Sequence, residues 1–264
     1  MPRLFAVFDL ETNGFHGASV LSASSIVFTD EGRIVDFFNR FYYPEERPDR
    51  RTEAVHGLSL ERVGALRAEE EYPAHFLDDW TSLALFWEQW NPEGIAVHNL
   101  PFDTGFLPGT VVRRQRWWCS MRGLTDLCRL PGGNPAGGLW KWPRLREASR
   151  TAEALYLPSP ALTRTEGTVG PHLSHYGLSD CFELYGLVLR VLGGSPALVC
   201  FAPSAAPSRF RPPMRGRYPI PYPRRDAFVR ERLRYAARIA DAAAMPERRD
   251  ILERLAAGEE SSPF

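Results

Sequence analysis

The chain has 264 residues, no formal net charge at neutral pH and an apolar content of 44%, as expected for a soluble globule with one large domain or one domain and an appendage. No apolar run reaches the length of a membrane span, and a predicted strand begins directly at the N-terminus. We therefore expect a soluble cytoplasmic protein without a membrane partner. The four cysteines are widely spaced and form no Cys-x-x-Cys pair, which argues against a structural zinc site or a disulfide framework.

Charge is distributed unevenly along the chain. Ten arginines and two acids lie between Arg209 and Arg238, so this stretch carries a net charge of +8. Aromatic residues are interleaved with these arginines, a composition suited to phosphate contact and base stacking. A solvated linker followed by a solvated helix face explains the same composition equally well.

The first third of the chain predicts a three-stranded antiparallel meander, with strands at residues 3–9, 20–29 and 33–43. A polar loop over 52–59 should lead into a short helix, for which Ser59 is a suitable N-cap. Residues 72–90 have apolar side chains at helical spacing, so we predict a core-packed helix whose tryptophans are buried.

The middle of the chain alternates short strands with helices. We predict a strand at 94–97, a helix up to Arg116 that Pro108-Gly109 interrupts, and an edge strand at 116–120. Further predicted elements are helices at 124–130 and 142–150, a long connector at 151–174, an apolar helix at 175–192, and a short strand or apolar extension at 198–202.

Composition divides the chain near residue 202. Residues 1–202 carry the predicted strands and most of the helices, and we assign them to one domain. From residue 203 to 264 the chain becomes a Pro/Arg-rich linker followed by a helical tail.

Two acids separated by one residue, Asp9 and Glu11, end the first strand. Alternate residues of a strand point to the same side, so both carboxylates face the same way. Two carboxylates repel each other and need either solvent or a cation between them. The pair alone fits a solvated strand end as well as it fits a metal site.

Two later segments supply partners for this pair. His-Asn-x-x-Phe-Asp ends in Asp103 after the 94–97 strand, and His-x-x-x-x-Asp places His175 and Asp180 at the head of the apolar helix. Four acids from three separate element ends can converge on two Mg²⁺ or Mn²⁺ ions, which prefer hard oxygen ligands. A two-metal site hydrolyses phosphodiesters, and an imidazole near neutral pH is suited to take a proton from water.

These motifs resemble those of the DEDDh-type 3′-to-5′ exonucleases, a family that includes proofreading exonucleases. The resemblance covers residues 3–195. It implies an α/β fold, a ribonuclease H-like mixed β-sheet flanked by helices. It also assigns the general-base position to His175 and the metal-ligand positions to four acids, Asp9, Glu11, Asp103 and Asp180.

The resemblance also implies the substrate contacts. Val55-His56-Gly57-Leu58 resembles the family's loop at the terminal nucleotide, and the other implied contacts are Leu10, Thr12, Asn99 and Phe102. The implied activity is release of nucleoside 5′-monophosphates from the 3′ end of single-stranded DNA or RNA, with a role in proofreading or DNA repair. The tail from residue 203 is where we would place contact with a polymerase or another nucleic-acid-processing partner.

The chain departs from the family pattern at three places. Gly177 stands where the family usually has alanine, the better helix former, so the first turn there is expected to be looser. The connector before His175 is long, and Pro108-Gly109 breaks the helix after Asp103. None of these departures removes a catalytic group.

Other interpretations stay open. His175 could be a surface-loop histidine, and Phe102 could equally be a core residue. His98 is better explained as a core residue at a strand end, and Cys181 as a small buried hydrophobe. A nucleic-acid-binding or partner module with the same fold and little or no hydrolysis is the second hypothesis. The sequence leaves the oligomeric state and the choice between DNA and RNA open.

Overall fold

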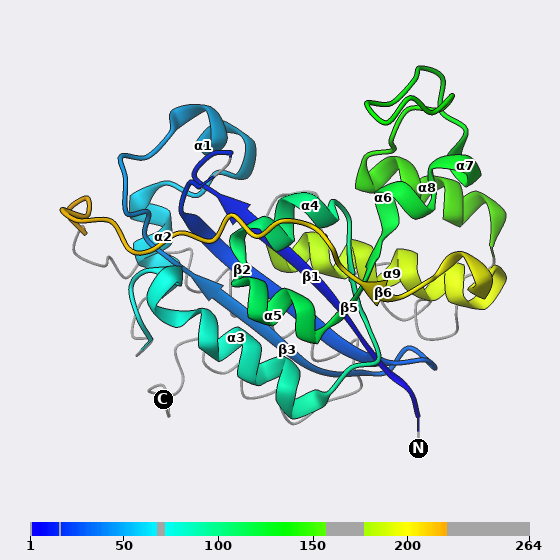
Figure 1. The fold of residues 1–264 in the computed structure, drawn as a ribbon, viewed down its shortest axis with the longest axis horizontal. Helices are drawn as coiled ribbons and strands as arrows, with labels where there is room; N and C mark the ends of the chain where they lie inside the picture. Colours follow the sequence, from blue (N-terminus) through cyan, green and yellow to red (C-terminus); the bar gives the residue numbers. More distant parts are fainter. Residues whose placement is uncertain (1, 16, 68–71, 157–176, 221–264) are drawn as a thin grey trace, which may run out of the picture.

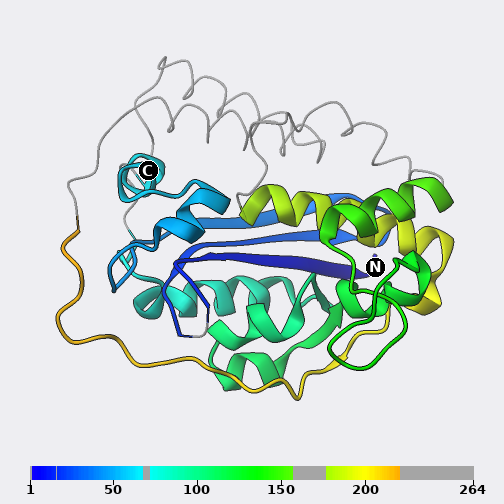
Figure 2. The same ribbon diagram turned by 90° about the horizontal axis from the view of Figure 1, so that it is seen from above.

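The computed structural model describes residues 2–15, 17–67, 72–156 and 177–220. A six-stranded mixed sheet lies between two layers of helices (Figure 1 and Figure 2). Its strands, in the order β3-β2-β1-β4-β5-β6, are β3 (Ile34–Phe41), β2 (Val20–Thr29), β1 (Leu4–Thr12), β4 (Ile95–Val97), β5 (Arg116–Cys119) and β6 (Ala202–Pro203). The first three are antiparallel neighbours, β4 runs parallel to β1, and β5 runs parallel to β4. This topology confirms the predicted ribonuclease H-like α/β fold.

The helices of the described residues are short, apart from three. The longer ones are α3 (Phe76–Trp90), α8 (Leu145–Leu155) and α9 (Gly177–Gly194). The short ones are α1 (Arg50–His56), α2 (Leu60–Arg67), α4 (Leu100–Asp103), α5 (Gly109–Arg114), α6 (Ser120–Gly123) and α7 (Thr125–Cys128), with 3₁₀ turns η1 (Thr104–Phe106) and η3 (Pro196–Leu198).

The central strand β1 supplies both faces of the core. Phe5 and Val7 belong to the apolar cluster that includes α8 and α9, whereas Ala6, Phe8 and Leu10 belong to the cluster that includes α3 and α5. Seen from above, α9 covers one face of the sheet and α3 and α5 cover the other (Figure 2). Successive side chains of β1 point to opposite faces of the sheet, so the position of a residue in the strand decides on which face its side chain lies.

Most predicted elements are present, and three differ in detail. Residues 50–56 form α1, which covers the first part of the loop expected at 52–59. The helix forms because the Asp49 side chain accepts from Arg51 N at 2.8 Å and Gly57 ends it at φ 69°. Helix α8 begins at Leu145 and not at 142, since Glu147 accepts from the backbone N–H of Arg144. It also runs to Leu155, so residues 151–155 are helical where we expected the connector to begin. Strand β5 is not an edge strand, because β6 pairs with it.

The structure shows directly two of the three departures from the family pattern. The helix after Asp103 is broken: η1 follows α4 directly, and α5 begins only at Gly109, after Pro108. At Gly177, α9 approaches β2 so closely that an added Cβ would meet Ser24 Oγ at 3.0 Å and Ser22 Oγ at 3.1 Å. Glycine thus permits the close approach of the helix to the sheet at this end.

Residues 201–220, which we call the C-terminal strap, lie along the domain (Figure 1 and Figure 2). Phe201 stacks on Phe5 with ring centroids 5.4 Å apart, and Ser208 Oγ donates to Leu107 O at 2.6 Å. Phe210 packs edge-on against Trp80, with ring centroids 6.0 Å apart. The first part of the predicted linker is therefore attached to the domain surface.

Some of the sequence predictions lie outside the described residues. These are the connector from 157 to 174, His175, and the helices of the tail beyond residue 220. The division at residue 202 accordingly stays a prediction. Among the helices that are described, none combines the length and apolarity needed to cross a membrane.

Asp79 allows a stability test of the face that carries α3. It is 3% exposed and accepts from Arg40 Nη1 at 2.7 Å, Tyr42 Oη at 2.9 Å and Ser82 Oγ at 2.7 Å. We expect Asp79→Ala to lower the free energy of unfolding by about 3 kcal/mol, because it removes the acceptor of Arg40 and of the buried Tyr42 hydroxyl. Urea denaturation measures the change.

Glu88→Ala is the control, since Glu88 pairs with Arg114 at the surface, where both side chains are about half exposed or more. Exposed pairs of this kind contribute about 0–1 kcal/mol. Equal losses in the two variants would contradict the role assigned to Asp79.

Candidate active site

Asp9 and Glu11 follow Val7 along β1, on the face that α9 covers. The same alternation buries Leu10, 4% exposed, among the side chains of the opposite face. Asp180 lies in the first turn of α9. One carboxylate oxygen from each of Asp9, Glu11 and Asp180 can be chosen so that all three lie within 4.8 Å of one another. The packing of α9 on the sheet therefore brings the helix acid to the strand pair, although they are far apart in sequence.

Asp103, the last residue of α4, joins the same group. It is 3% exposed, and the backbone amide of Leu10, the residue between Asp9 and Glu11, hydrogen-bonds its carboxylate. Strand β4 delivers α4 to this point because β4 runs parallel to β1 as its neighbour. All four predicted acids thus gather at one end of the sheet.

The acids raise one another's proton affinity. Burial is the first cause that raises the pKa of Asp9 and of Glu11 well above the ordinary range, and the charges of Asp180 and Asp103 add to it. Burial likewise raises the pKa of Asp103 to about 8, although hydrogen bonds from the backbone of Asp103, Leu10 and Asn99 lower it. A cation among these carboxylates would remove the repulsion.

The donor set fits a hard divalent cation. It consists of carboxylate oxygens alone, which suits Mg²⁺ or Mn²⁺ better than softer metals. The raised pKa values mean that the protein holds these groups together at a cost in free energy. The predicted general base, His175, lies outside the described residues, so its position relative to the acids stays a prediction.

The predicted substrate contacts lie in three different settings. The side chain of Leu10 is buried, and its backbone N–H already hydrogen-bonds the Asp103 carboxylate. Thr12 is buried, with its hydroxyl donating to Gly14 O at 2.8 Å. His56 ends α1 and is buried, with Nδ1 accepting from Leu58 N at 2.9 Å. Asn99 precedes α4 as its N-cap, and its carbonyl accepts from Phe102 N at 2.9 Å.

An aromatic group lies beside Asp103. The ring centroid of Phe102 is 5.2 Å from that of Phe106 and 6.3 Å from that of Phe15, and both pairs are edge-on. Phe15 is 76% exposed. The sequence prediction missed Phe15, which lies in the turn after the acid pair, because its contact with Phe102 joins segments that are far apart in sequence.

Two residues with open interpretations have structural roles. His98 lies between Ser120 Oγ, 2.9 Å from Nδ1, and Pro143 O, 3.0 Å from Nε2, and burial lowers its pKa to about 4. Cys181 is fully buried and donates to Ser24 O at 3.1 Å, and burial raises its pKa, with the charge of Asp9 adding to the effect. A thiol of this kind is a poor nucleophile.

Comparison with known proteins gives fold neighbours alone. No family model matches the chain, and no curated protein matches it. Among solved structures, exonuclease X in complex with 5′ overhanging duplex DNA is 21% identical over 73% of this chain and 93% of its own, with a TM-score of 0.48. An exonuclease I structure is 16% identical over 74% of this chain, with a TM-score of 0.49, and E. coli exonuclease I with a dT13 oligonucleotide is 15% identical with the same coverage and score.

The matched part corresponds to 42% of each of those two exonuclease I chains. Both kinds of neighbour are exonucleases, the class that the sequence motifs resemble. Likenesses at these scores and identities do not assign an activity, so a proposed activity has to rest on the acids themselves.

Proposed function

We propose that the protein is a metal-dependent 3′-to-5′ exonuclease that releases nucleoside 5′-monophosphates from DNA or RNA. The observation that carries the proposal is the convergence of Asp9, Glu11 and Asp180, with Asp103 near enough for its charge to raise the pKa of both strand acids. Burying mutually repelling acids costs free energy, and a pair of Mg²⁺ or Mn²⁺ ions would offset this cost.

The four acids are the proposed ligands of two ions. When bound, the ions supply charge stabilisation to the phosphoryl group and to the leaving 3′ oxygen. The chain's own residues then hold the reacting groups: β1 and α9 fix the carboxylates from opposite sides, and His175 takes the proton of the attacking water. The phosphorus to 3′-oxygen bond breaks, and the 5′-monophosphate departs.

The aromatic group supplies the proposed contact to bases. Phe102 lies in α4 next to Asp103, and the exposed ring of Phe15 lies beside it. Aromatic rings next to a phosphate-processing site stack on bases of any sequence, which suits an enzyme that removes successive nucleotides. Leu10, through its backbone, Thr12, His56 and Asn99 are proposed as the remaining substrate contacts.

The basic stretch from Arg209 has a different role in its described part. Arg211 and Arg217 form ion pairs with acids of the domain, so neither the nucleic-acid interpretation nor the solvated-linker interpretation describes these two arginines. Contact between the residues beyond 220 and the strand or a protein partner stays a proposal, as do cytoplasmic location and a role in repair or proofreading.

The acids should be required for cleavage. With a 5′-labelled single strand and Mg²⁺ or Mn²⁺, we expect mononucleotide release from the 3′ end, a loss of about 10³-fold or more in Asp9→Ala, and a loss of about 10²-fold or more in His175→Ala. The measurement is the product ladder on a denaturing gel, with EDTA abolishing it.

Asp126→Ala is the matched control, because Asp126 is an exposed acid of α7 outside the cluster, and it should keep full activity. Tight strand binding without cleavage in the wild type would favour the binding module instead. Full activity in His175→Ala would remove the assignment of the base.

Metal and pH should act on stability through the same acids. The pKa values of Asp9, Glu11 and Asp103 are raised in the folded protein, so the protonated carboxyl groups stabilise it fully below about pH 4. The contribution of Asp103 is lost as the pH rises through about 8, and those of Asp9 and Glu11 are lost as the pH rises through their own raised pKa values. Without metal, at pH 8, we expect Asp9→Asn to be more stable than the wild type, by about 1 kcal/mol. Thermal denaturation in EDTA measures the difference.

Added Mn²⁺ should raise the melting temperature of the wild type at pH 8 and raise it less at pH 5, where protons compete for the carboxylates. Asp9→Asn should lose most of the rise, and Asp126→Asn should keep it. A rise of the same size in Asp9→Asn would place the bound ion elsewhere.

A further inference from the structure

We infer that Arg211 of the C-terminal strap is a positioning residue, which holds the turn between β1 and β2 and with it Phe15, the exposed member of the aromatic group beside Asp103. The inference rests on the proposed function and adds a residue from outside the motifs. The turn comprises residues 13–15 and 17–19 of the described chain and carries Phe15.

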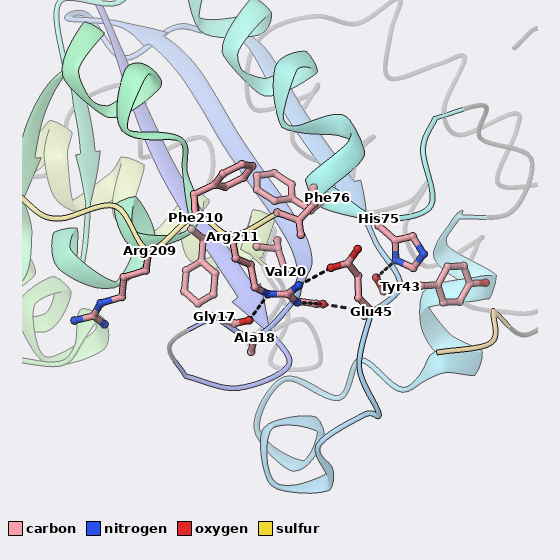
Figure 3. A pocket seen from close by; sticks show the side chains of 13 residues that line it. Gly17, Ala18, Val20, Tyr43, Glu45, His75, Phe76, Arg209, Phe210 and Arg211 are labelled. Carbon is pink, nitrogen blue, oxygen red and sulfur yellow. Dashed lines mark hydrogen bonds and ion pairs between the residues drawn. The ribbon is translucent and has the colours of Figure 1, made fainter. Parts of the chain in front are cut away.

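Arg211 reaches into the turn from the strap (Figure 3). Its Nε donates to Gly17 O, and its Nη2 donates to Ser19 Oγ at 3.3 Å. The guanidinium also faces acids: Nη1 donates to Glu45 Oε2 at 2.6 Å and Nη2 to Glu46 Oε2 at 3.0 Å. One planar group therefore joins the turn to the segment after β3, which a lysine ammonium cannot reproduce.

Glu46 extends this connection to the start of the turn. Its Oε1 accepts from Asn13 Nδ2 at 2.9 Å and from Ser19 N at 2.8 Å, and its Oε2 accepts from Ser19 Oγ at 2.7 Å. Burial raises the pKa of Glu46, but these hydrogen bonds outweigh it and hold the pKa below the ordinary range. The carboxylate is therefore ionised, and Arg211 supplies its counter-charge.

The position of the turn matters because of what it presents. Residue 13 lies two positions after Glu11, and Phe15 lies edge-on to Phe102, the neighbour of Asp103. The strap also contacts η1, which carries Phe106 of the aromatic group, since Arg209 N donates to Gly105 O at 2.9 Å. Loss of Arg211 should therefore displace Phe15 while leaving Asp9 and Glu11 fixed in β1.

Arg217 offers a matched comparison. It donates to the same buried acid, Glu45 Oε1, at 2.5 Å, and to Asp78 at 2.6 Å. These two hydrogen-bond partners both lie outside the turn. The side chain of Glu45 is only 1% exposed, so either substitution leaves this carboxylate with one arginine fewer. The two variants should resemble each other in stability and differ at the turn.

The experiment compares Arg211→Ala, Arg211→Lys and Arg217→Ala in the full chain. Hydrogen exchange of residues 13–19 is the readout that needs no activity, and KM and kcat on a short single strand with Mn²⁺ are the functional readout. We expect faster exchange in Arg211→Ala, with KM raised about tenfold and kcat within about threefold. Arg211→Lys should recover less than half of the change in KM, and Arg217→Ala should match the wild type in both readouts.

Unchanged hydrogen exchange and unchanged KM in Arg211→Ala would overturn the inference. Equal changes in Arg217→Ala would also overturn it, because they would assign the effect to attachment of the strap as a whole. If Arg211→Ala does not fold, Arg211→Lys against Arg217→Ala decides the question by the same criteria. An inactive wild type would refute the proposed function, whereas the exchange comparison would still decide whether Arg211 holds the turn.

Discussion

Repulsion among four acids is the constraint on which the site depends. Asp9, Glu11 and Asp103 all have raised pKa values, with burial as the first cause. The apolar contacts of α9 with β1 and β2 hold Asp180 against the strand pair despite this repulsion. The close approach at Gly177 belongs to the same packing, because a side chain there would press on the serines of β2. Core packing thus keeps the mutually repelling charges together, as the proposed metal site requires.

The strap shows that the surroundings of the site are built from distant parts of the chain. Residues 201–220 contact the sheet edge, η1 and the β1–β2 turn in succession. The acids are fixed by regular elements, whereas Phe15 lies on a turn to which Arg211 and Glu46 hydrogen-bond. Under the proposed function, this division would separate the groups that do chemistry from the groups that place the substrate.

The sheet could be predicted from the sequence, because β1 to β3 are apolar runs of good strand formers that turn-forming residues separate. The meeting of the acids was also predictable, since each lies at an element end that strand pairing and helix packing bring to one edge. Helix α1 was missed because its stability comes from the Asp49 cap and the Gly57 end and not from an apolar face. The roles of Phe15 and Arg211 were not predictable, because they arise from contacts between segments far apart in sequence, which periodicity does not encode.

The most direct test of the central claim is a crystal structure with Mn²⁺, in which anomalous scattering locates the ions. We predict two ions, about 3.5–4 Å apart, both held by carboxylates of Asp9, Glu11, Asp103 and Asp180. Absence of Mn²⁺ from these carboxylates at a concentration that supports cleavage would contradict this prediction.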